Sequence, residues 1–196
     1  MFRPKTPVVP AATGSSTANA LVNATDAAYG LSTSGSAAAN ATALAAADAA
    51  AVSAGKTLWI PKGSYSTTGV TFTARVYCDT GAVLVASTGT LAFNGGVEWD
   101  ISPHLTLTGT ALATFNRQKI LVGYAEWWGA VPNDSGTDSL AAIQFAVDAL
   151  NQVQLLGAAY YTSGVLTCDV TGGVLKGATV MGSVATAVSA GITSIV

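Results

Sequence analysis

Apolar and polar residues alternate through the middle of the chain, and the alternation is clearest in one segment. Thr, Arg and Tyr fill the positions between Val70, Phe72, Ala74, Val76 and Cys78, and an Asp follows the last of them. Successive side chains of a β-strand point to opposite faces, so this pattern predicts a strand with one buried face.

Shorter apolar runs continue the pattern toward the C-terminus. They are separated by Gly, Asn, Ser and Pro, and they lie at residues 82–86, 91–93, 97–101, 105–107, 111–115 and 120–122. Strands this short, spaced by about eight residues, are typical of a sandwich, a barrel or a solenoid. Asn94-Gly95-Gly96 is the nearest approach to a two-residue hairpin turn, which favours a parallel solenoid over antiparallel hairpins.

Two segments break the strand pattern and predict helices. The first, residues 36–55, is rich in alanine, the residue with the highest helix propensity. Gly55 stands where a glycine commonly ends a helix. Leu44 and Val52 are its only large apolar residues, so we expect this helix to lie close against its neighbours.

The second helix is expected after the loop that runs from Asp134 to Asp138. Thr137 or Asp138 is the expected N-cap, since either side chain can accept a backbone N–H. Phe145 falls opposite the apolar stripe, either as an exposed residue or as a second contact surface. The stripe itself, at helical spacing, comprises Leu140, Ile143, Val147 and Leu150.

The two halves of the chain share an order of elements. In each half a helix leads to Tyr, two or three Ser/Thr, Gly and Val, and then to Cys-Asp, Gly and Val-Leu; the copies begin at Tyr65 and Tyr160. The spacings differ by about five residues, so the similarity is one of pattern and not of fixed period. Chance similarity between segments of small residues is the alternative. In a genuine repeat, each helix would cover the open end of a stack of strands.

Composition narrows the possible functions. Only 9% of the residues are charged, whereas soluble domains usually have about a quarter. Lys and Arg number 8 against 10 Asp and Glu, and no basic patch is present, so nucleic-acid binding has little electrostatic support.

The sequence also gives little support for a membrane-spanning helix or for a secretion signal. The uncharged tail at residues 177–196 is interspersed with Ser, Thr and Gly, so we expect strand and turn there, not a membrane-spanning helix. Pro4, Pro7 and Pro10 interrupt the N-terminus, which argues against a signal peptide.

Candidate catalytic and metal-binding residues are sparse. His104 is the only histidine, and Cys78 and Cys168 are 90 positions apart, so no zinc site, other metal site or His-dependent triad is expected. Both cysteines are expected to be buried as small hydrophobes. Glu98 and Asp100 share a strand face and could form a carboxylate pair, but solvated acids are the expected interpretation. We therefore assign no catalytic residue and no cofactor.

One segment resembles a known family. Glu126-Trp127-Trp128-Gly129-Ala130-Val131, the Asp/Ser/Gly loop, Thr137-Asp138 and Ala141-Ala142-Ile143-Gln144 resemble the start of the pectate-lyase-like right-handed β-helix. The form is that of bacteriophage tailspikes and tail-borne capsule depolymerases. Residues 56–65, KTLWIPKGSY, resemble the strand, Pro-x-Gly and Tyr that follow the helix in that family. The resemblance covers roughly residues 36–75 and 124–181.

The sequence departs from the family pattern in three places. The loop at residues 133–136 has one acid where the family often has two, no Pro-x-Gly precedes Tyr160, and residues 1–35 match no known family. The resemblance implies structural roles for Trp127, Trp128, Gly129, Thr137, Asp138 and Ile143. The tryptophans could also stack on sugar rings, but a packed joint between two modules is the preferred interpretation.

The resemblance implies a mainly β fold with two short capping helices, the start of a right-handed parallel β-helix, and a homotrimer. Residues 1–35 would be an extended segment bound to a tail or adaptor protein, which would order it. Residues 36–122 would form a small helix-capped β-rich domain, and residues 123–196 the linker, capping helix and first rungs. The chain would then belong to an extracellular virion, with glycan binding and cleavage beyond Val196.

The sequence is also compatible with two other functions. The chain could itself be a polysaccharide lyase or hydrolase of the β-helix type. It could instead be a secreted β-helical adhesin. The preferred hypothesis is a structural virion component that attaches a tailspike and supports recognition of the host surface.

Overall fold

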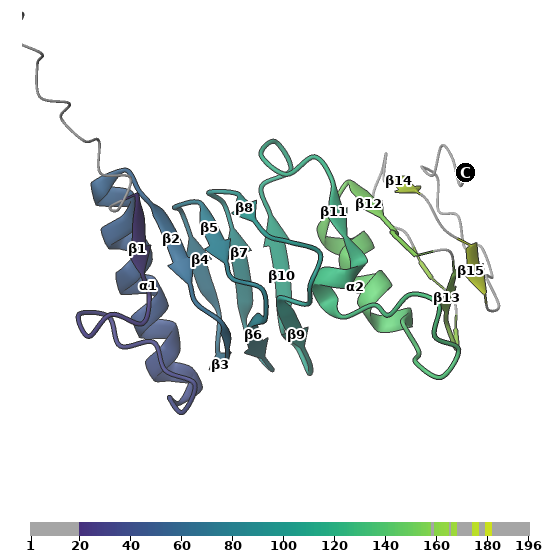
Figure 1. Ribbon diagram of the computed structural model, residues 1–196, viewed down its shortest axis with the longest axis horizontal. Coiled ribbons are helices and arrows are strands. Elements are labelled where there is room, and N and C mark those ends of the chain that lie inside the picture. The colour runs from purple at the N-terminus through teal and green to yellow at the C-terminus, as the bar shows by residue number, and fades with distance from the viewer. Residues whose placement is uncertain (1–19, 158, 165, 168–173, 177–178, 182–196) are drawn as a thin grey trace, which may run out of the picture.

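Parallel strand pairing dominates the computed structural model, whose described residues form two α-helices and five small sheets (Figure 1). The structure describes residues 20–157, 159–164, 166–167, 174–176 and 179–181. Every strand pair recorded among these residues is parallel. The expected solenoid pattern is therefore confirmed at the level of parallel strands stacked at regular intervals.

Three of the sheets run side by side along the first half of the molecule. The first sheet contains β1 (Leu21–Asn23), β2 (Thr57–Ile60), β5 (Val76–Cys78) and β8 (Val97–Glu98). The second contains β3 (Gly63–Thr67), β6 (Ala82–Ala86) and β9 (Leu105–Leu107). The third contains β4 (Val70–Phe72), β7 (Thr90–Phe93) and β10 (Leu112–Phe115). The chain visits the three sheets in turn, so β2–β4, β5–β7 and β8–β10 form three successive coils, which we call the first stack.

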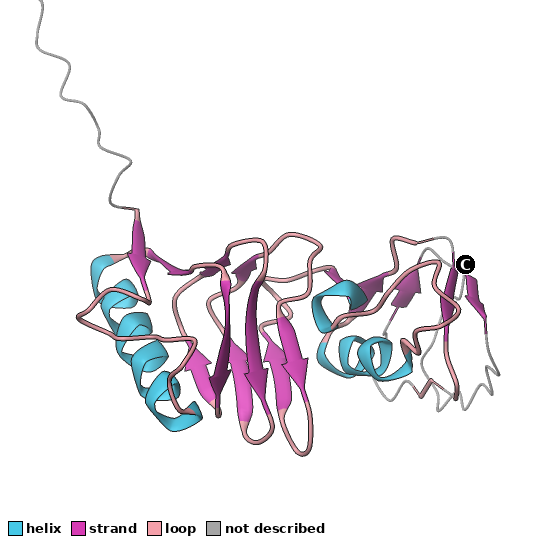
Figure 2. Ribbon diagram, turned by 60° about the horizontal axis from the view of Figure 1, so that its bottom comes forward, coloured by secondary structure: helices cyan, strands magenta, loops and turns pink. Residues whose placement is uncertain are grey.

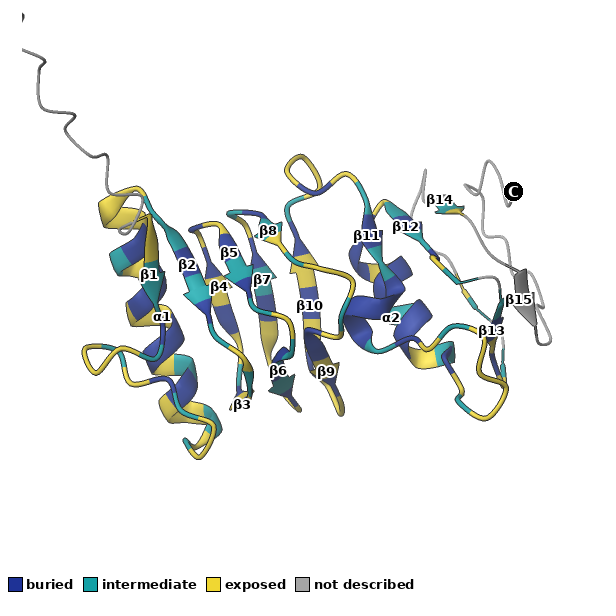
Figure 3. Cartoon of the chain, in the orientation of Figure 1, coloured by how far each residue is buried: buried dark blue, intermediate teal, exposed yellow. Residues whose placement is uncertain are grey.

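The register of the first stack repeats at nearly constant spacing. Val76 pairs with Val97, 21 positions later, and Leu84 pairs with Leu105 at the same separation. In every strand of the first stack except β8, alternate residues point inward and are buried (Figure 3). Phe72, Phe93 and Phe115 occupy equivalent positions, and their rings stack with centroids 4.9 and 5.0 Å apart. These three rings form a phenylalanine column that runs through the core of the first stack.

The alternation between residues 70 and 78 belongs to two strands and not to one. All five of its apolar residues are buried, as expected, but the chain bends after Phe72 and enters β5 at Val76. The Asp48 carboxylate accepts hydrogen bonds from the backbone N–H groups of Thr73 and Ala74 at this bend. The alternation of apolar and polar residues continues across the bend because both strands present their apolar residues to the same core.

Helix α1 (Ala37–Ala54) covers the open end of the first stack, and the predicted helix is confirmed (Figure 1). The Ser36 side chain accepts from the Ala39 N–H, and Gly55 ends the helix in the left-handed conformation at φ 63°. The helix packs against β1, β2, β3 and β4. Alanines 43, 47 and 51 are buried, which allows the close approach expected from the sequence.

Residues 20–35 belong to this end of the molecule. β1 pairs with β2, and Ala24 and Leu31 are buried in the core. The prediction that a partner orders this whole segment is therefore wrong for residues 20–35, since the chain's own first sheet and α1 order them. Residues 1–19 lie outside the described part of the chain.

The second half begins where the first stack ends. β11 (Gly123–Tyr124) leads into the short 3₁₀ helix η2 (Ala125–Trp128), and then comes α2 (Leu140–Ala149). Next are β12 (Gln152–Gln154), β13 (Ala159–Tyr161), β14 (Val174–Lys176) and β15 (Thr179–Met181). β12 pairs with β11 and β14, and β13 pairs with β15. We call these paired strands the second stack, and α2 lies between the two stacks (Figures 1 and 2).

Several boundaries differ from the sequence predictions. β8 ends at Glu98, so Asp100 and Ile101 follow the strand, and the strand expected at residues 120–122 lies at Gly123–Tyr124. Cys78 is buried as expected, and Cys168 lies outside the described residues. In the described part of the chain, neither α-helix has the length and hydropathy that crossing a bilayer requires.

Candidate functional site

The most distinctive segment of the sequence forms the junction between the two stacks. All four residues of η2 are buried, and Gly129 ends the turn at φ 86°, with its N–H bonded to the carbonyls of Ala125 and Glu126. A left-handed backbone at this point favours glycine. We use the name tryptophan joint for Asp100, His104, Glu126, Trp127 and Trp128.

Trp127 links the joint to the last coil of the first stack. Its Nε1–H donates to the backbone oxygen of Asp100 at 2.7 Å. Its ring makes an edge-on contact with Trp99, with centroids 5.2 Å apart, and a second one with Tyr124 at 5.6 Å. The indole is 3% exposed. Trp127 therefore holds two consecutive parts of the fold together.

Trp128 ends the phenylalanine column. Its ring meets Phe115 edge-on at 5.6 Å, and it is 7% exposed. Its Nε1 has no hydrogen-bond partner among the described residues. With both indoles buried, neither presents a flat face on which a sugar ring could stack.

Asp100 and His104 form a polar network beside Trp127. His104 is fully buried; its Nδ1 lies 2.9 Å from the Ala82 carbonyl oxygen and its Nε2 lies 2.8 Å from Asp100 Oδ1. Each ring nitrogen therefore faces an oxygen atom, and the ring is held between β6 and the turn after β8. Partial burial opposes ionisation of Asp100, but hydrogen bonds from Ser102, Thr80 and His104 together hold the pKa of its carboxyl well below the ordinary value.

This network does not have the geometry of a catalytic triad. Ser102 Oγ donates to Asp100, and the carboxylate faces the histidine Nε2 that would have to take the serine proton. The opposite ring nitrogen is bonded to a backbone carbonyl. The arrangement fixes the turn after β8 against β6 and does not activate a nucleophile.

Glu126 makes a second buried contact, across 34 residues. Tyr160 Oη donates to its Oε1, which also accepts the Leu156 N–H at 3.2 Å. Burial and the neighbouring Glu126 carboxylate raise the pKa of Tyr160 to about 12. Glu126 Oε2 is buried with no partner among the described residues. Glu126 thus ties η2 to the second stack, as Trp127 ties it to the first.

The structure places the other motif residues around α2. Ile143 is fully buried on the helix face that includes Val147 and Leu150, while Leu140 and Phe145 are half-buried. Phe145 packs against the core, so it is a contact residue.

Neither Thr137 nor Asp138 is the N-cap of α2. The N-cap is Ser139, and its hydroxyl bonds the backbone of Val131. Thr137 donates to Asp134 within the loop. Asp138 accepts from the N–H of Leu140 and from both the N–H and the hydroxyl of Ser163, and these bonds lower the pKa of its carboxyl. Asp138 therefore joins the start of α2 to the second stack.

The acids expected to share a strand face have separate partners. Glu98 forms an ion pair with Arg75, and Asp100 belongs to the tryptophan joint. Within the described residues, no three His, Cys, Asp or Glu side chains gather as metal ligands would. The arrangement in the joint can position and orient backbone segments, because Asp100 and Glu126 each accept hydrogen bonds from other parts of the chain.

The tryptophans stand out in the sequence, whereas their partners do not. His104, Glu126 and Tyr160 act across 22 to 34 residues, at separations that no local pattern marks. One signal was available for Glu126, which opens the Glu-Trp-Trp motif. Comparison of the chain with protein-family models, curated proteins and solved structures gave no match.

Proposed function

We propose that this chain is the N-terminal attachment and assembly region of a homotrimeric, tailspike-like fibre on a bacteriophage tail. In this proposal the two stacks wind as a right-handed parallel β-helix, and residues 1–19 bind a tail or adaptor protein. The host glycan is bound, and cleaved where cleavage occurs, by parts of the fibre beyond this chain.

The observation that carries the proposal is the tryptophan joint between two parallel stacks. Trp127 binds the first stack, Glu126 binds the second, and α2 lies between them. A joint of this kind builds an elongated shaft from successive capped units. The motif that resembles the tailspike family is thus used for assembly of the fold.

The surface composition also supports assembly with other copies. Few charges are available to keep copies apart, and several large apolar side chains are exposed: Ile101, Leu112, Leu121, Leu156 and Tyr161. Exposed apolar side chains in the described region offer contact area for neighbouring chains.

Light scattering coupled to size exclusion tests the assembly. We expect a mass three times that of the 19.5 kDa chain at micromolar concentration. A monomer across that range would overturn trimer formation by this region. Deletion of residues 1–19 should leave the trimer intact and abolish retention on purified tail particles.

An assay for capsule or lipopolysaccharide degradation separates this proposal from the enzymatic alternative. The isolated chain should leave the polysaccharide uncleaved. Turnover that is lost in an acid-to-amide variant of this chain would overturn the structural assignment in favour of a lyase or hydrolase.

A further inference from the structure

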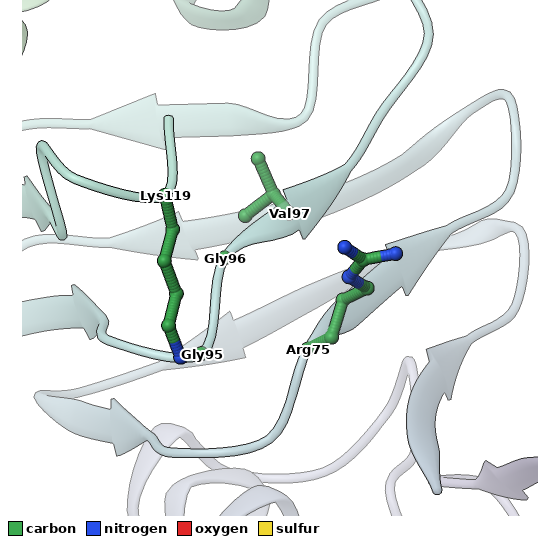
Figure 4. A pocket seen from close by; sticks show the side chains of 5 residues that line it. All are labelled: Arg75, Gly95, Gly96, Val97 and Lys119. Atoms are coloured by element: carbon green, nitrogen blue, oxygen red, sulfur yellow. The ribbon is translucent and has the colours of Figure 1, made fainter. Parts of the chain in front are cut away.

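The charged residues of the first stack are confined to one side of it. Residues 56–119 contain eight Asp, Glu, Lys and Arg, and all eight lie in the first sheet, in bends next to it, or in the bend after β10. Figure 4 shows two of them, Arg75 and Lys119, beside Gly95 and Gly96. The second and third sheets and the corner between them contain none, and we call the outward surface of these segments the neutral wall: residues 63–74, 82–96 and 105–116.

Hydroxyl and small apolar side chains alternate across the neutral wall. Each of its two sheets has an outward column in which an exposed hydroxyl residue, a half-buried apolar residue and a second exposed hydroxyl residue lie in register. A hydroxyl both donates and accepts, so one column can form hydrogen bonds with the other column of a second copy. The columns are Ser66, Val85 and Thr106 in the second sheet, and Thr71, Ala92 and Thr114 in the third.

The corner between the two sheets has no large side chain. Gly69, Gly89 and Gly109 lie there, one in each coil, and the other residues of the corner are Ser, Thr and Ala. A Cβ on Gly89 would lie 2.5 Å from the backbone nitrogen of Gly69, so the coils leave no space for one. Another chain can therefore approach this corner closely.

We propose that copies of this chain associate through the neutral wall, with the second sheet of one copy against the third sheet of the next. The inference rests on the proposed function, because it names the interface of the homotrimer. A closed ring of three copies uses heterologous contacts, so each copy must offer two different surfaces. Two neighbouring faces meet this requirement when the corner that they share points toward the three-fold axis.

A second copy of the chain matches the neutral wall in charge. Contact between two such walls buries no charged side chain, and so avoids the cost of removing a charge from water. Leu112, which is half exposed on β10, adds apolar contact area to the third sheet. A strongly charged partner would find no opposite charge to pair with on these faces. The charged first sheet then remains in contact with water.

Light scattering of the full chain and its variants over a dilution series tests the inference. Thr106→Lys and Thr114→Lys each bury an unpaired charge in the interface, so each should raise the concentration of half-dissociation about tenfold or more. Gln118→Lys adds the same charge at an exposed position in the bend after β10 and should leave that concentration unchanged. Circular dichroism verifies that each variant keeps the fold.

Two double variants test which faces meet. Thr106→Lys with Thr114→Lys places like charges on the facing sheets of neighbouring copies, whereas Thr106→Lys with Thr114→Glu places opposite charges there. The second should associate about tenfold more tightly than the first, and added salt should reduce the difference.

The outcomes separate the interface from the trimer itself. A monomeric wild-type chain would overturn the trimer and the interface together. A wild-type trimer that tolerates both lysine variants, or that Gln118→Lys disrupts equally, would overturn the interface alone. Equal association of the two double variants would contradict the contact between the second sheet of one copy and the third sheet of the next.

Discussion

The molecule contains two units: β1, α1 and the first stack form the first unit, and α2 and the second stack form the second. The two units share one arrangement of elements and differ in what surrounds the helix. In the first, β1 precedes α1 and pairs in parallel with β2, which follows the helix; in the second, β11 and β12 stand in the same relation to α2. Buried tyrosines also recur, Tyr65 on β3 and Tyr160 on β13. The internal repeat expected from the sequence therefore has a structural counterpart in this order of elements.

The two helices form side-chain hydrogen bonds to the neighbouring backbone in different ways. α1 covers an end, and two buried polar residues bind the first coil: Asp48 accepts two N–H groups, and Asn40 donates to Ser66 and bonds Ser32. α2 packs on η2, β10 and β12, and its side-chain hydrogen bonds to the second stack are made by the more exposed Gln144 and, just before the helix, Asp138. The polar side chains that join helix to strands are thus buried at α1 and more exposed at α2.

The largest expected effect is at the joint. Trp127→Ala should lower the free energy of unfolding by about 3–5 kcal/mol, because it removes a buried indole and the bond to Asp100. Trp127→Phe keeps most of the ring area and should cost about 1–2 kcal/mol. Urea denaturation measures both. Equal costs for the two variants would mean that packing contributes little beyond the Nε1 bond.

Substitutions of Asp48 on α1 and Gln144 on α2 test whether the buried hydrogen bonds of α1 contribute more stability than the exposed ones of α2. Asp48→Ala leaves the Thr73 and Ala74 N–H groups without their partner and should cost about 3 kcal/mol. Gln144→Ala removes three hydrogen bonds to Thr167 at the exposed rim and should cost less than about 1 kcal/mol, because these groups can bond to water instead. Chemical denaturation compares them, and a larger loss for Gln144→Ala would reverse our account of the two helices.

Alkaline pH should weaken the second unit through Tyr160. Its pKa in the folded protein is about 12, above the ordinary value of 10.0, so the unfolded chain releases this proton first. Stability is therefore fully present below pH 10 and falls as pH rises toward 12. Tyr160→Phe should flatten this part of the stability profile. Burial also raises the pKa of Tyr65, so some pH dependence will remain in the variant.

The smallest expected effect concerns Asp134 and Asp138, two exposed acids of one loop. Asp138→Asn weakens bonds between α2 and Ser163, whereas Asp134→Asn affects bonds only within the loop. Both carboxyls have lowered pKa values, so their contributions are present above the ordinary value and are lost as pH falls below it. Hydrogen exchange at Ser163 should increase in Asp138→Asn and stay unchanged in Asp134→Asn.

Local signals explain what the sequence could predict. Ser36 and Gly55 mark the ends of α1 because capping chemistry involves neighbouring residues. Inward apolar residues were identified because alternation persists through the bends of the coil. The bend after Phe72 was missed, since its stabilising partner, Asp48, lies on a helix 25 residues earlier.

The candidate site was predictable only in part for the same reason. The tryptophans stand out in a sequence of small residues, but the roles of Glu126 and His104 depend on contacts that only the coiling creates. Asp138 was recognised as important at the helix start, yet its partner Ser163 belongs to another strand region. Residue type indicates that a polar group needs a partner, and the topology decides which partner it finds.

The equivalent positions of Phe72, Phe93 and Phe115 have a consequence for how such a chain can change in length. Loss of residues 76–96 would remove one whole turn of the spiral and bring Phe72 onto Phe115, with every inward residue still facing inward. Loss of a few residues would instead break the alignment of all three sheets. Shafts of this design can therefore lengthen or shorten during evolution in steps of about twenty residues, while both ends keep their caps.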